Sequence, residues 1–549
     1  MRSALTKPVV IISSKKNWKF FSDGCVKIHA KGSVSKNEAC ELAKKFNSTS
    51  EPDLLDVFLD WLVTMHGHFG IIVECKDKIF SATDRTASYQ IFHTNIEKAI
   101  FVGNEAQSLV DKAKLNEIDE LGLLSLSMSG YVTGDRTLLK NLSALQPGVA
   151  LFADRFKIKK ISYHKYAPKE LSCVDDESNL LEQLSEITLA KLEDIKAKAN
   201  GRQIVVPLSA GLDSRLILSG LKYLNTPNLF SFSYGQSNNF EAETARKVSN
   251  KIDINWQFVP MTNASQRDFF SSSLHRDYIC FSHDFISTPF EQDLYPVEKL
   301  ISTGFIDRDA IIINGNSGDY ISGAHIPDFA SGQGLLDDTM LKFLIEEFVK
   351  KHFGLWEGKF SQEDNQIIYE LLTEELKREG LLKNRSFMAF TLWERLEFLN
   401  RQSKYVISGQ RVYDFLNMQW DLPLWSDEYL DFWSCVPLQH KFGQSLYKKM
   451  LFTKNWCGVW GDIPTNRKTI SPLWIRPIRF AAKILCSPFG RKNWHKFEKR
   501  VFSYWMDWGG NYAIESYFDL LTRKEIARNS VSLHTEKYIE FVYKKLGKS

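Results

Sequence analysis

The sequence predicts an α/β protein with two large domains, and three observations support this. The chain has 549 residues, more than one ordinary hydrophobic core accommodates. Its first part is β-rich, whereas its middle part alternates apolar strands with helices, a pattern typical of a parallel sheet with helical crossovers. We therefore expect domains over 1–165 and 176–470, followed by a basic, helical C-terminal extension over 471–549.

The β-rich part consists of short strand patterns joined by turns. Residues 66–85, HGHFGIIVECKDKIFSATDR, contain two strands around a polar turn, which indicates a hairpin. Residues 98–110 predict a strand that leads into a helix. Residues 141–166 alternate again around a turn at Pro147 and Gly148. The first 165 residues or so therefore form one β-rich unit.

The middle part begins with an amphipathic helix over 175–200, opened by acidic residues that suit a helix N-terminus. Residues 202–224 predict a strand, a loop and a helix. Further strands and helices follow in alternation, at 227–235, 238–252, 255–261 and 310–323. Residues 335–450 are predicted to be mainly helical. The boundary between the two domains is expected near 160–180.

Composition excludes several classes of protein. Apolar residues make up 44% and charged residues 25%, with a net charge of +4, so no global charge argues for nucleic acid as a partner. The eight cysteines form no CxxC pair, and we expect reduced, mostly buried thiols in a cytoplasmic protein. The N-terminal apolar run is too short for a signal peptide. No stretch approaches the roughly 18 apolar residues of a transmembrane segment.

The stretch VVPLSAGLDSRLILSG, residues 205–220, places small and acidic residues between a strand and a helix. Backbone N–H groups of such a turn and the helix N-terminus can hold an anion. Asp213 would repel a bare phosphate, and Mg²⁺ bridging carboxylate and phosphate removes that conflict. No Gly-Lys-Ser/Thr and no G-x-G-x-x-G is present, so a P-loop and a dinucleotide site are disfavoured. The alternative is a simple helix cap.

The motif LSAGLDS, residues 208–214, resembles the S-G-G-x-D-S loop of ATP pyrophosphatases (PP-loop enzymes, with an adenine-nucleotide α-hydrolase-like fold). More narrowly, the chain resembles the asparagine synthetase family. Matching motifs follow in order: FEAETARKVS, INGNSGDYISGAH, ERLEFLNRQSKYVISGQRVYDFLNMQWDLPLWSDEYLDFWSCVPLQHKF, LYKKML and IPTNRK. The resemblance spans most of residues 60–470. It implies an ATP-dependent ligase that adenylates a carboxylate and forms an amide, with ATP and Mg²⁺ as cofactors.

The N-terminal part resembles the glutaminase domain of the same family, an Ntn-hydrolase-like β-rich sandwich. Active members carry a cysteine directly after the initiator methionine, whereas this chain has Arg2, and its first cysteine is Cys25. Cys25 as a relocated nucleophile would require processing. The resemblance therefore implies an inactive, scaffolding domain, with ammonia or an amine supplied from elsewhere, such as a separate ammonia source.

The resemblance also assigns roles to individual residues. Asp213 and Asp319 are implied metal ligands, and Lys448 is the implied catalytic cation, with Lys449, Arg467 and Lys468 as runners-up. Two residues depart from the family: Asn316 stands where a glutamate takes part in amidation, and Tyr320 replaces an acid. The residues implied to bind ATP or pyrophosphate are Ser209, Ala210, Gly211, Leu212, Asp213, Ser214, Ser233 and Gly315, with Tyr234 beside the adenosine.

Three functions remain open at this point. The first is amide formation on a sugar uronate in surface polysaccharide biosynthesis. The second is intramolecular ring closure of the β-lactam synthetase or lasso-peptide cyclase type, and the third is a non-catalytic nucleotide-binding scaffold. The basic, aromatic segment 471–500 suits a membrane surface or an acidic partner, although its prolines favour a solvated, partly packed appendage. The acceptor, the amine and the oligomeric state, a homo-oligomer included, stay undetermined.

Overall fold

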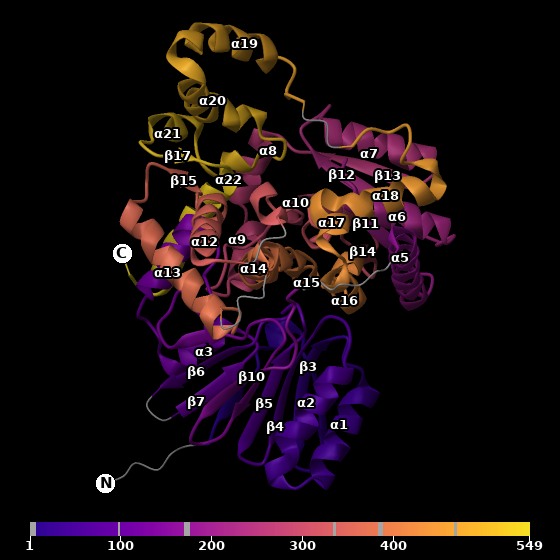
Figure 1. Cartoon of the computed structure of the whole chain (residues 1–549), viewed down its shortest axis with the longest axis vertical. Coiled ribbons are helices and arrows are strands. Elements are labelled where there is room, and N and C mark those ends of the chain that lie inside the picture. The colour runs from indigo at the N-terminus through magenta and orange to yellow at the C-terminus, as the bar shows by residue number, and fades with distance from the viewer. Residues whose placement is uncertain are drawn as a thin grey trace.

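A computed structural model describes residues 7–96, 99–168, 176–332, 336–382, 388–465 and 469–548 (Figure 1). The β-rich N-terminal part forms one end of the molecule, and the parallel sheet with its helices lies above it. A pair of C-terminal helices forms the opposite end. The α/β class predicted from the sequence is thus confirmed at the level of mixed sheets and helices.

The N-terminal part contains two sheets. The six-stranded sheet has the order β10-β9-β5-β4-β3-β2, and the four-stranded sheet has the order β1-β7-β6-β8. The predicted hairpin is present, because β4 pairs with β5 antiparallel. The strands are β1 Val9–Ile11, β2 Lys19–Asp23, β3 Val26–Gly32, β4 Phe69–Cys75, β5 Lys78–Thr83, β6 Phe92–Ile96, β7 Ala99–Gly103, β8 Leu142–Ala144, β9 Val149–Ala153 and β10 Ile158–Ser162.

The alternating directions of the side chains along β4 explain why the two sheets and their helices stack in layers. Ile71 and Val73 pack with the helices α1 (Lys36–Ser48) and α2 (Leu54–Thr64) on one face. Ile72, between them, packs with Val102 of the other sheet. Since successive strand residues point to opposite faces, one apolar run fills two cores. The sequence prediction of a β-rich part left out both helices, although α1 begins with a capping box at Ser35.

The middle part contains a five-stranded parallel sheet of order β13-β12-β11-β14-β16. Val205 packs on one face of β11 and Val206 on the other, so helices cover both faces. The strands are β11 Ile204–Pro207, β12 Leu229–Gly235, β13 Asn255–Pro260, β14 Ile311–Ile313 and β16 Gln419–Asp421. The prediction missed β16, whose three residues carry too short a pattern.

Helices surround this sheet and connect it to the rest. They include a π-helical stretch over Phe398–Val406, which continues α14. The helices of this part are α5 Glu177–Ala199, α6 Asp213–Tyr223, α7 Phe240–Lys251, α8 Asn263–Phe270, α9 Ser273–Ser282, α10 Leu294–Ser302, α11 Gly318–Ile321, α12 Asp338–His352, α13 Gln362–Arg378, α14 Ala389–Glu397, α15 Arg411–Phe415, α16 Asp427–Cys435, α17 Leu438–Lys441 and α18 Ser445–Lys454.

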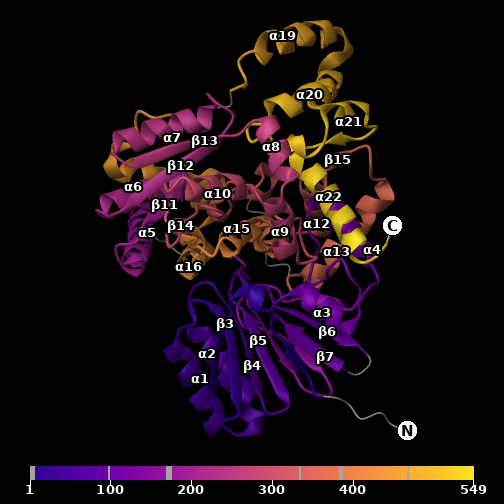
Figure 2. The same ribbon diagram turned by 180° about the vertical axis from the view of Figure 1, so that it is seen from behind.

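The C-terminal segment runs out to the tip of the molecule and then returns (Figure 2). Tyr538 and Val542 of its last helix pack in one core with Leu109 and Leu126 of the N-terminal part. The remaining elements are α3 Ala106–Ala113, α4 Glu120–Ser129, β15 Trp356–Glu357, α19 Ile475–Cys486, α20 Gly490–Met506, α21 Tyr517–Thr522, β17 Ile526–Ala527 and α22 Ser530–Lys545. The returning helix therefore ties the two ends of the chain together.

Two sequence expectations can be compared with this structure. Of the seven described cysteines only Cys75 is buried, while Cys25, Cys280 and Cys435 are exposed. The prediction of mostly buried thiols is therefore wrong, and Cys173 lies outside the described residues. Within the described ranges, no helix is both long and apolar enough to cross a membrane.

Candidate functional site

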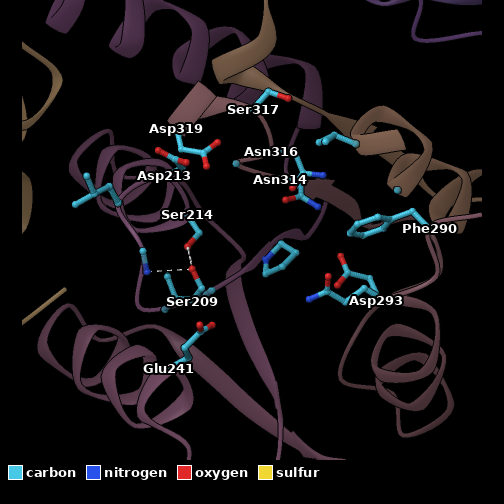
Figure 3. A pocket seen from close by; sticks show the side chains of 18 of the residues that line it. Ser209, Asp213, Ser214, Glu241, Phe290, Asp293, Asn314, Asn316, Ser317 and Asp319 are labelled. Atoms are coloured by element: carbon cyan, nitrogen blue, oxygen red, sulfur yellow. Dashed lines mark hydrogen bonds between the residues drawn. The ribbon is translucent and has the colours of Figure 1, made fainter. Parts of the chain in front are cut away.

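The loop between β11 and α6, residues 208–212, is held by its own serines. The Ser209 backbone N–H donates to Ser214 Oγ at 3.1 Å, and the Gly211 N–H donates to Ser209 Oγ at 3.1 Å. The two serine hydroxyls lie 3.2 Å apart (Figure 3). Ala210 is buried and keeps a negative φ, so alanine in place of glycine introduces no backbone strain.

This loop lines a cavity of about 450 Å³ at the carboxyl ends of β11, β12 and β14. The connections from β11 run toward one edge of the sheet and those from β14 toward the other. The cavity therefore lies at the point where the strand order reverses, the usual ligand position in such sheets. Its lining includes Ser209, Gly211, Leu212, Asp213, Ser214, Ser233, Tyr234, Glu241, Phe290, Asp293, Asn314, Gly315, Asn316, Ser317, Asp319, Arg401 and Trp508.

Asp213 and Asp319 point toward each other across the mouth of the loop (Figure 3). Gly315 permits this approach, because a Cβ there would lie 2.9 Å from Asp213 Cβ and 3.0 Å from the Ser214 nitrogen. Gly315 thus brings its own loop against the start of α6. The Asp213 carboxylate accepts a hydrogen bond from the Tyr447 hydroxyl, at 2.8 Å, and another from the Asp319 backbone N–H. Two carboxylates therefore face one space.

The two carboxylates differ in pKa. Removal from bulk water, followed by the negative charge of Asp319, raises the pKa of Asp213 to about 7. Burial also disfavours charge on Asp319, but the hydrogen bond and positive charge of His325 outweigh it and lower the Asp319 pKa. The Asp213 carboxyl is therefore partly protonated near neutral pH unless a cation binds to the pair.

The pair is suited to a divalent metal. Mg²⁺ is usually held by one or two carboxylates, with waters and substrate phosphates completing its octahedron. Asp213 and Asp319 supply that number of carboxylates beside a loop of hydroxyl and N–H donors. In the described part of the chain, no group of three or more His, Cys, Asp or Glu side chains is clustered as a complete protein metal site. The donor set therefore fits a metal that arrives with phosphate.

The Asp213 carboxyl predicts a specific pH dependence of stability. Because its folded pKa of about 7 exceeds the ordinary 3.8, the folded protein holds a proton that the unfolded chain has released between these values. Stability contributed by Asp213 is thus lost as pH rises toward 7. We expect Asp213→Asn to stabilise the metal-free protein by about 1–3 kcal/mol more at about pH 8 than at about pH 4. Urea unfolding of the variant and the parent at both pH values measures their free energies of unfolding. A stabilisation by Asp213→Asn that is the same at both pH values would contradict this prediction.

A histidine connects the acid pair to a second group of charges. His325 Nε2 lies 3.1 Å from Asp319 Oδ2, and His325 Nδ1 lies 2.5 Å from Glu397 Oε1. Arg401 Nη1 donates to the same Glu397 oxygen at 3.3 Å. Although burial lowers it, the charges and hydrogen bonds of Glu397 and Asp319 raise the pKa of His325 to about 9. His325 is therefore a cation at neutral pH.

A second cavity, of about 290 Å³, opens on the other side of Arg401 and Tyr405, which line both cavities. We call it the cationic cavity. Its side chains come from the end of α4, the segment after α11, α12, α14, the π-helical stretch and the start of α22 with the residues before it. Its lining is Ser129, Tyr131, His325, Lys351, His352, Leu355, Glu397, Arg401, Tyr405, Arg528, Asn529 and Val531. Lysine and arginine outnumber the single acid, so the cavity is suited to an anion.

Most of the residues singled out in the sequence line the first cavity, with four exceptions. Ala210 lies behind the loop, where its carbonyl accepts from Arg215 at 3.3 Å. Lys448 is exposed outside the cavity and donates to the Gly443 carbonyl at 2.8 Å, and Lys449 pairs with Glu177. Tyr320 is buried away from it, donating to the Glu394 carbonyl at 2.7 Å. Arg467 and Lys468 lie outside the described residues.

Several residues of the two cavities were not predicted. Glu241 stands in the motif FEAETAR, so the sequence held a signal for it. Asp293 accepts from the Tyr413 hydroxyl at 2.5 Å and also from Tyr234. Arg401 stands in the motif that begins ERLEFLNRQSKY, whereas Trp508 comes from a segment without a distinctive local pattern. The residue of α18 that reaches the site is Tyr447, whose hydroxyl donates to Asp213, and not Lys448.

Comparison with known proteins gives little beyond this geometry. No family model matches the sequence, and no curated protein does. The structure is similar to an allosteric regulatory enzyme of purine biosynthesis, at 10% identity and a TM-score of 0.19, over 46% of this chain and 59% of that one. It is also similar to glutamine phosphoribosylpyrophosphate amidotransferase from B. subtilis, at 10% identity and a TM-score of 0.19, over 44% of this chain and 72% of that one. TM-scores of 0.19 do not establish a shared fold.

Proposed function

We propose that the protein is an ATP-dependent carbon–nitrogen ligase that adenylates a carboxylate and forms an amide with ammonia or an amine. The observation that carries this proposal is that the Asp213–Asp319 pair lines the first cavity, while Arg401 and Tyr405 line both the first cavity and the cationic cavity. One cavity has the serine-bearing loop that suits a triphosphate, and the other has the cations that suit an anionic acceptor. A ligase of this kind must hold both reactants side by side.

The triphosphate is expected to lie over residues 209–214. The N–H groups at the start of α6 and the hydroxyls of Ser209 and Ser214 provide donors. Asp213 and Asp319 would hold Mg²⁺, which neutralises phosphate charge when bound. Ser233 and Tyr234, at the end of β12, would frame the adenosine, with Ser233 fixed by its hydrogen bond to the Leu208 carbonyl at 2.6 Å.

The acceptor carboxylate is expected in the cationic cavity. Arg401 lines both cavities and would orient the carboxylate toward the α-phosphate. Lys351 and Arg528, farther along the cavity, would bind a second anionic or polar group of the acceptor. Since a water occupies about 30 Å³ of liquid, the cavity of about 290 Å³ has the volume of roughly ten waters, which accommodates a small acid of monosaccharide size. A sugar uronate has this size, in keeping with a role in surface polysaccharide biosynthesis.

The reaction then proceeds in two steps. A carboxylate oxygen attacks the α-phosphorus, the bond from that phosphorus to the bridging oxygen breaks, and pyrophosphate leaves with the electron pair. The nitrogen lone pair attacks the acyl carbon, the bond from that carbon to the AMP oxygen breaks, AMP leaves with the electron pair, and the nitrogen loses a proton to water. His325, as a cation, and Arg401 would stabilise the negative charge that develops in both steps. Asn316 lines the cavity but, as an amide, cannot accept the proton.

The N-terminal sandwich is proposed as a scaffold without glutaminase chemistry. Cys25, the first cysteine, lies in the turn after β2, where its sulfur is 3.9 Å from the Cys75 sulfur and 3.5 Å from Asn47 Oδ1. Neither neighbour can act as a general base for a thiol nucleophile. Ammonia or an amine would therefore come from another source.

Exchange of labelled pyrophosphate into ATP that requires an added carboxylic acid substrate tests the proposal. We expect exchange with one class among D-glucuronate, D-galacturonate, their 1-phosphates, L-aspartate and linear peptide acids, and none without acid. Product analysis with ammonia separates amide formation from ring closure, which consumes no added amine. Binding of Mg²⁺ and α,β-methylene-ATP without exchange on any acid would contradict the ligase proposal and favour a nucleotide-binding scaffold. Release of ammonia from glutamine by the purified chain would contradict the scaffold role of the sandwich.

A further inference from the structure

The helices α19 and α20 form a hairpin at one end of the molecule, and we call it the arm (Figures 1 and 2). In both views α19 lies beyond α20, at the greatest distance from the N-terminal sheets. Half of the exposed large apolar side chains of the described chain lie on the arm, within residues 473–497. They are Leu473, Trp474, Ile478, Phe480, Ile484, Leu485, Phe489 and Phe497.

The two faces of α19 have different surroundings. Ile475, Ala482 and Cys486 pack against Trp494 and Phe502 of α20. Ile478 and Leu485, seven residues apart, lie on another face and are 53% and 75% exposed, whereas the Trp474 ring, 52% exposed, packs edge-on against Trp505 of α20. An apolar stripe on the outside of a helix that is already packed on its inside has no role in folding the arm. Patches of this kind mark interaction surfaces.

The charges around this stripe are almost all positive. Residues 471–500 contain eight lysines and arginines and one acid, Glu498, whereas the whole chain has a net charge of only +4. Arg479 neutralises Glu498 by a direct ion pair, and Lys496 pairs with Glu357. The other basic residues that pair with no acid, within the residues that the structure describes, are Arg476, Lys483, Arg491, Lys492, Lys499 and Arg500. The tip of the arm therefore carries a concentrated positive charge.

The base of the arm is fixed to the body of the molecule at the candidate site. The Gln236 side chain donates to the carbonyls of Trp505 and Asp507 at 3.0 and 2.8 Å, and the Gln236 N–H donates to the Trp508 carbonyl at 2.7 Å. Trp508 itself lines the first cavity. The arm is thus a fixed extension of the cavity wall.

We infer that the arm docks the protein on a membrane surface that contains anionic lipid. Helices that lie in a membrane interface combine Trp, Phe and Leu on one face with Lys and Arg beside them, and each basic residue near an anionic surface adds to binding. The stripe lies at a projecting end of the molecule, which suits a flat surface.

Co-sedimentation of the full chain with vesicles tests this inference without requiring activity. We expect binding to phosphatidylcholine vesicles with about 30 mol% phosphatidylglycerol to exceed binding to pure phosphatidylcholine at least about tenfold, and to weaken with salt. Ile478→Ser with Leu485→Ser should reduce binding at least about tenfold. Lys483→Gln with Lys492→Gln should reduce mainly the binding to anionic vesicles. The matched control is Phe156→Ser, since Phe156 is 72% exposed in the turn between β9 and β10 of the sandwich.

If the Ile478/Leu485 variant has an unchanged melting curve and binds vesicles as well as the parent does, the inference is overturned. Failure of the parent to bind anionic vesicles would also overturn it. Self-association in sedimentation equilibrium that the same variant abolishes, without vesicle binding, would assign the arm to a second copy and also overturn it. A protein that binds vesicles but catalyses no pyrophosphate exchange would leave this inference standing and contradict only the proposed function.

Discussion

Asp213→Asn is expected to lower the exchange of pyrophosphate into ATP, measured with the carboxylic acid substrate, by about a thousandfold or more. The amide keeps the size of the carboxylate and can still accept from the Tyr447 hydroxyl, which lies 2.8 Å from Asp213 Oδ1. It removes one of the two negative charges that face the phosphate loop. Because the charge on Asp213 is unfavourable in the folded protein, the variant should be at least as stable as the parent. A loss of exchange would therefore report a loss of metal and phosphate binding and not of folding.

Asp462→Asn is the matched control. Asp462 is exposed and pairs with Lys251 at 3.0 Å, away from both cavities. We expect this variant to exchange pyrophosphate within about twofold of the parent, since exposed ion pairs contribute little. An Asp213→Asn variant that retains more than about a tenth of the parent rate would contradict a role for Asp213 at the metal.

Lys351→Met combined with Arg528→Gln should raise the KM for the acid about ten- to a hundredfold, with the KM for ATP within about twofold of the parent. Both cations line the cationic cavity and neither lines the first one. Methionine keeps the stem of Lys351, whose ammonium lies 4.9 Å from the Trp393 ring centre. The variant therefore removes charge and largely preserves packing. Steady-state kinetics with the best acid of the exchange assay measure the effect.

Lys350→Met provides the control for charge on the same helix. Lys350 is exposed and pairs with Glu347 at 3.0 Å, and it does not line the cationic cavity. Its KM values for both substrates should match the parent. Equal KM values for the acid in the Lys351/Arg528 variant and the parent would place the acceptor elsewhere. A rise in the KM for ATP alone would assign the cationic cavity to the nucleotide.

The sequence predicts those parts of the site whose signal is local. The run Ile204–Pro207 is a buried strand, the small residues after it form a loop, and the apolar pattern from Leu216 predicts the helix. Asp319, in the motif INGNSGDYISGAH, was implied by the family resemblance and not by this local pattern. The helix α1 had a comparable signal, since Ala39, Leu42, Ala43 and Phe46 are its buried residues. Its absence from the prediction is a missed periodicity and not a tertiary effect.

The cationic cavity could not be predicted from local pattern. Lys351, Arg401 and Arg528 come from three segments that only the fold brings to one cavity. The choice between Tyr447 and Lys448 shows the same limit on a smaller scale. Neighbouring residues on a helix point about 100° apart, so the tertiary packing of α18 decides which one faces the acids. It turns the Tyr447 hydroxyl toward Asp213 and leaves Lys448 in solvent.

A crystal structure of the full chain with Mg²⁺ and α,β-methylene-ATP tests the central claim most directly. The account predicts the triphosphate over residues 209–214, a metal ion contacting Asp213 and Asp319, and the α-phosphate facing Arg401. A triphosphate bound elsewhere, or residues 209–214 closed over an empty cavity at saturating nucleotide, would contradict it.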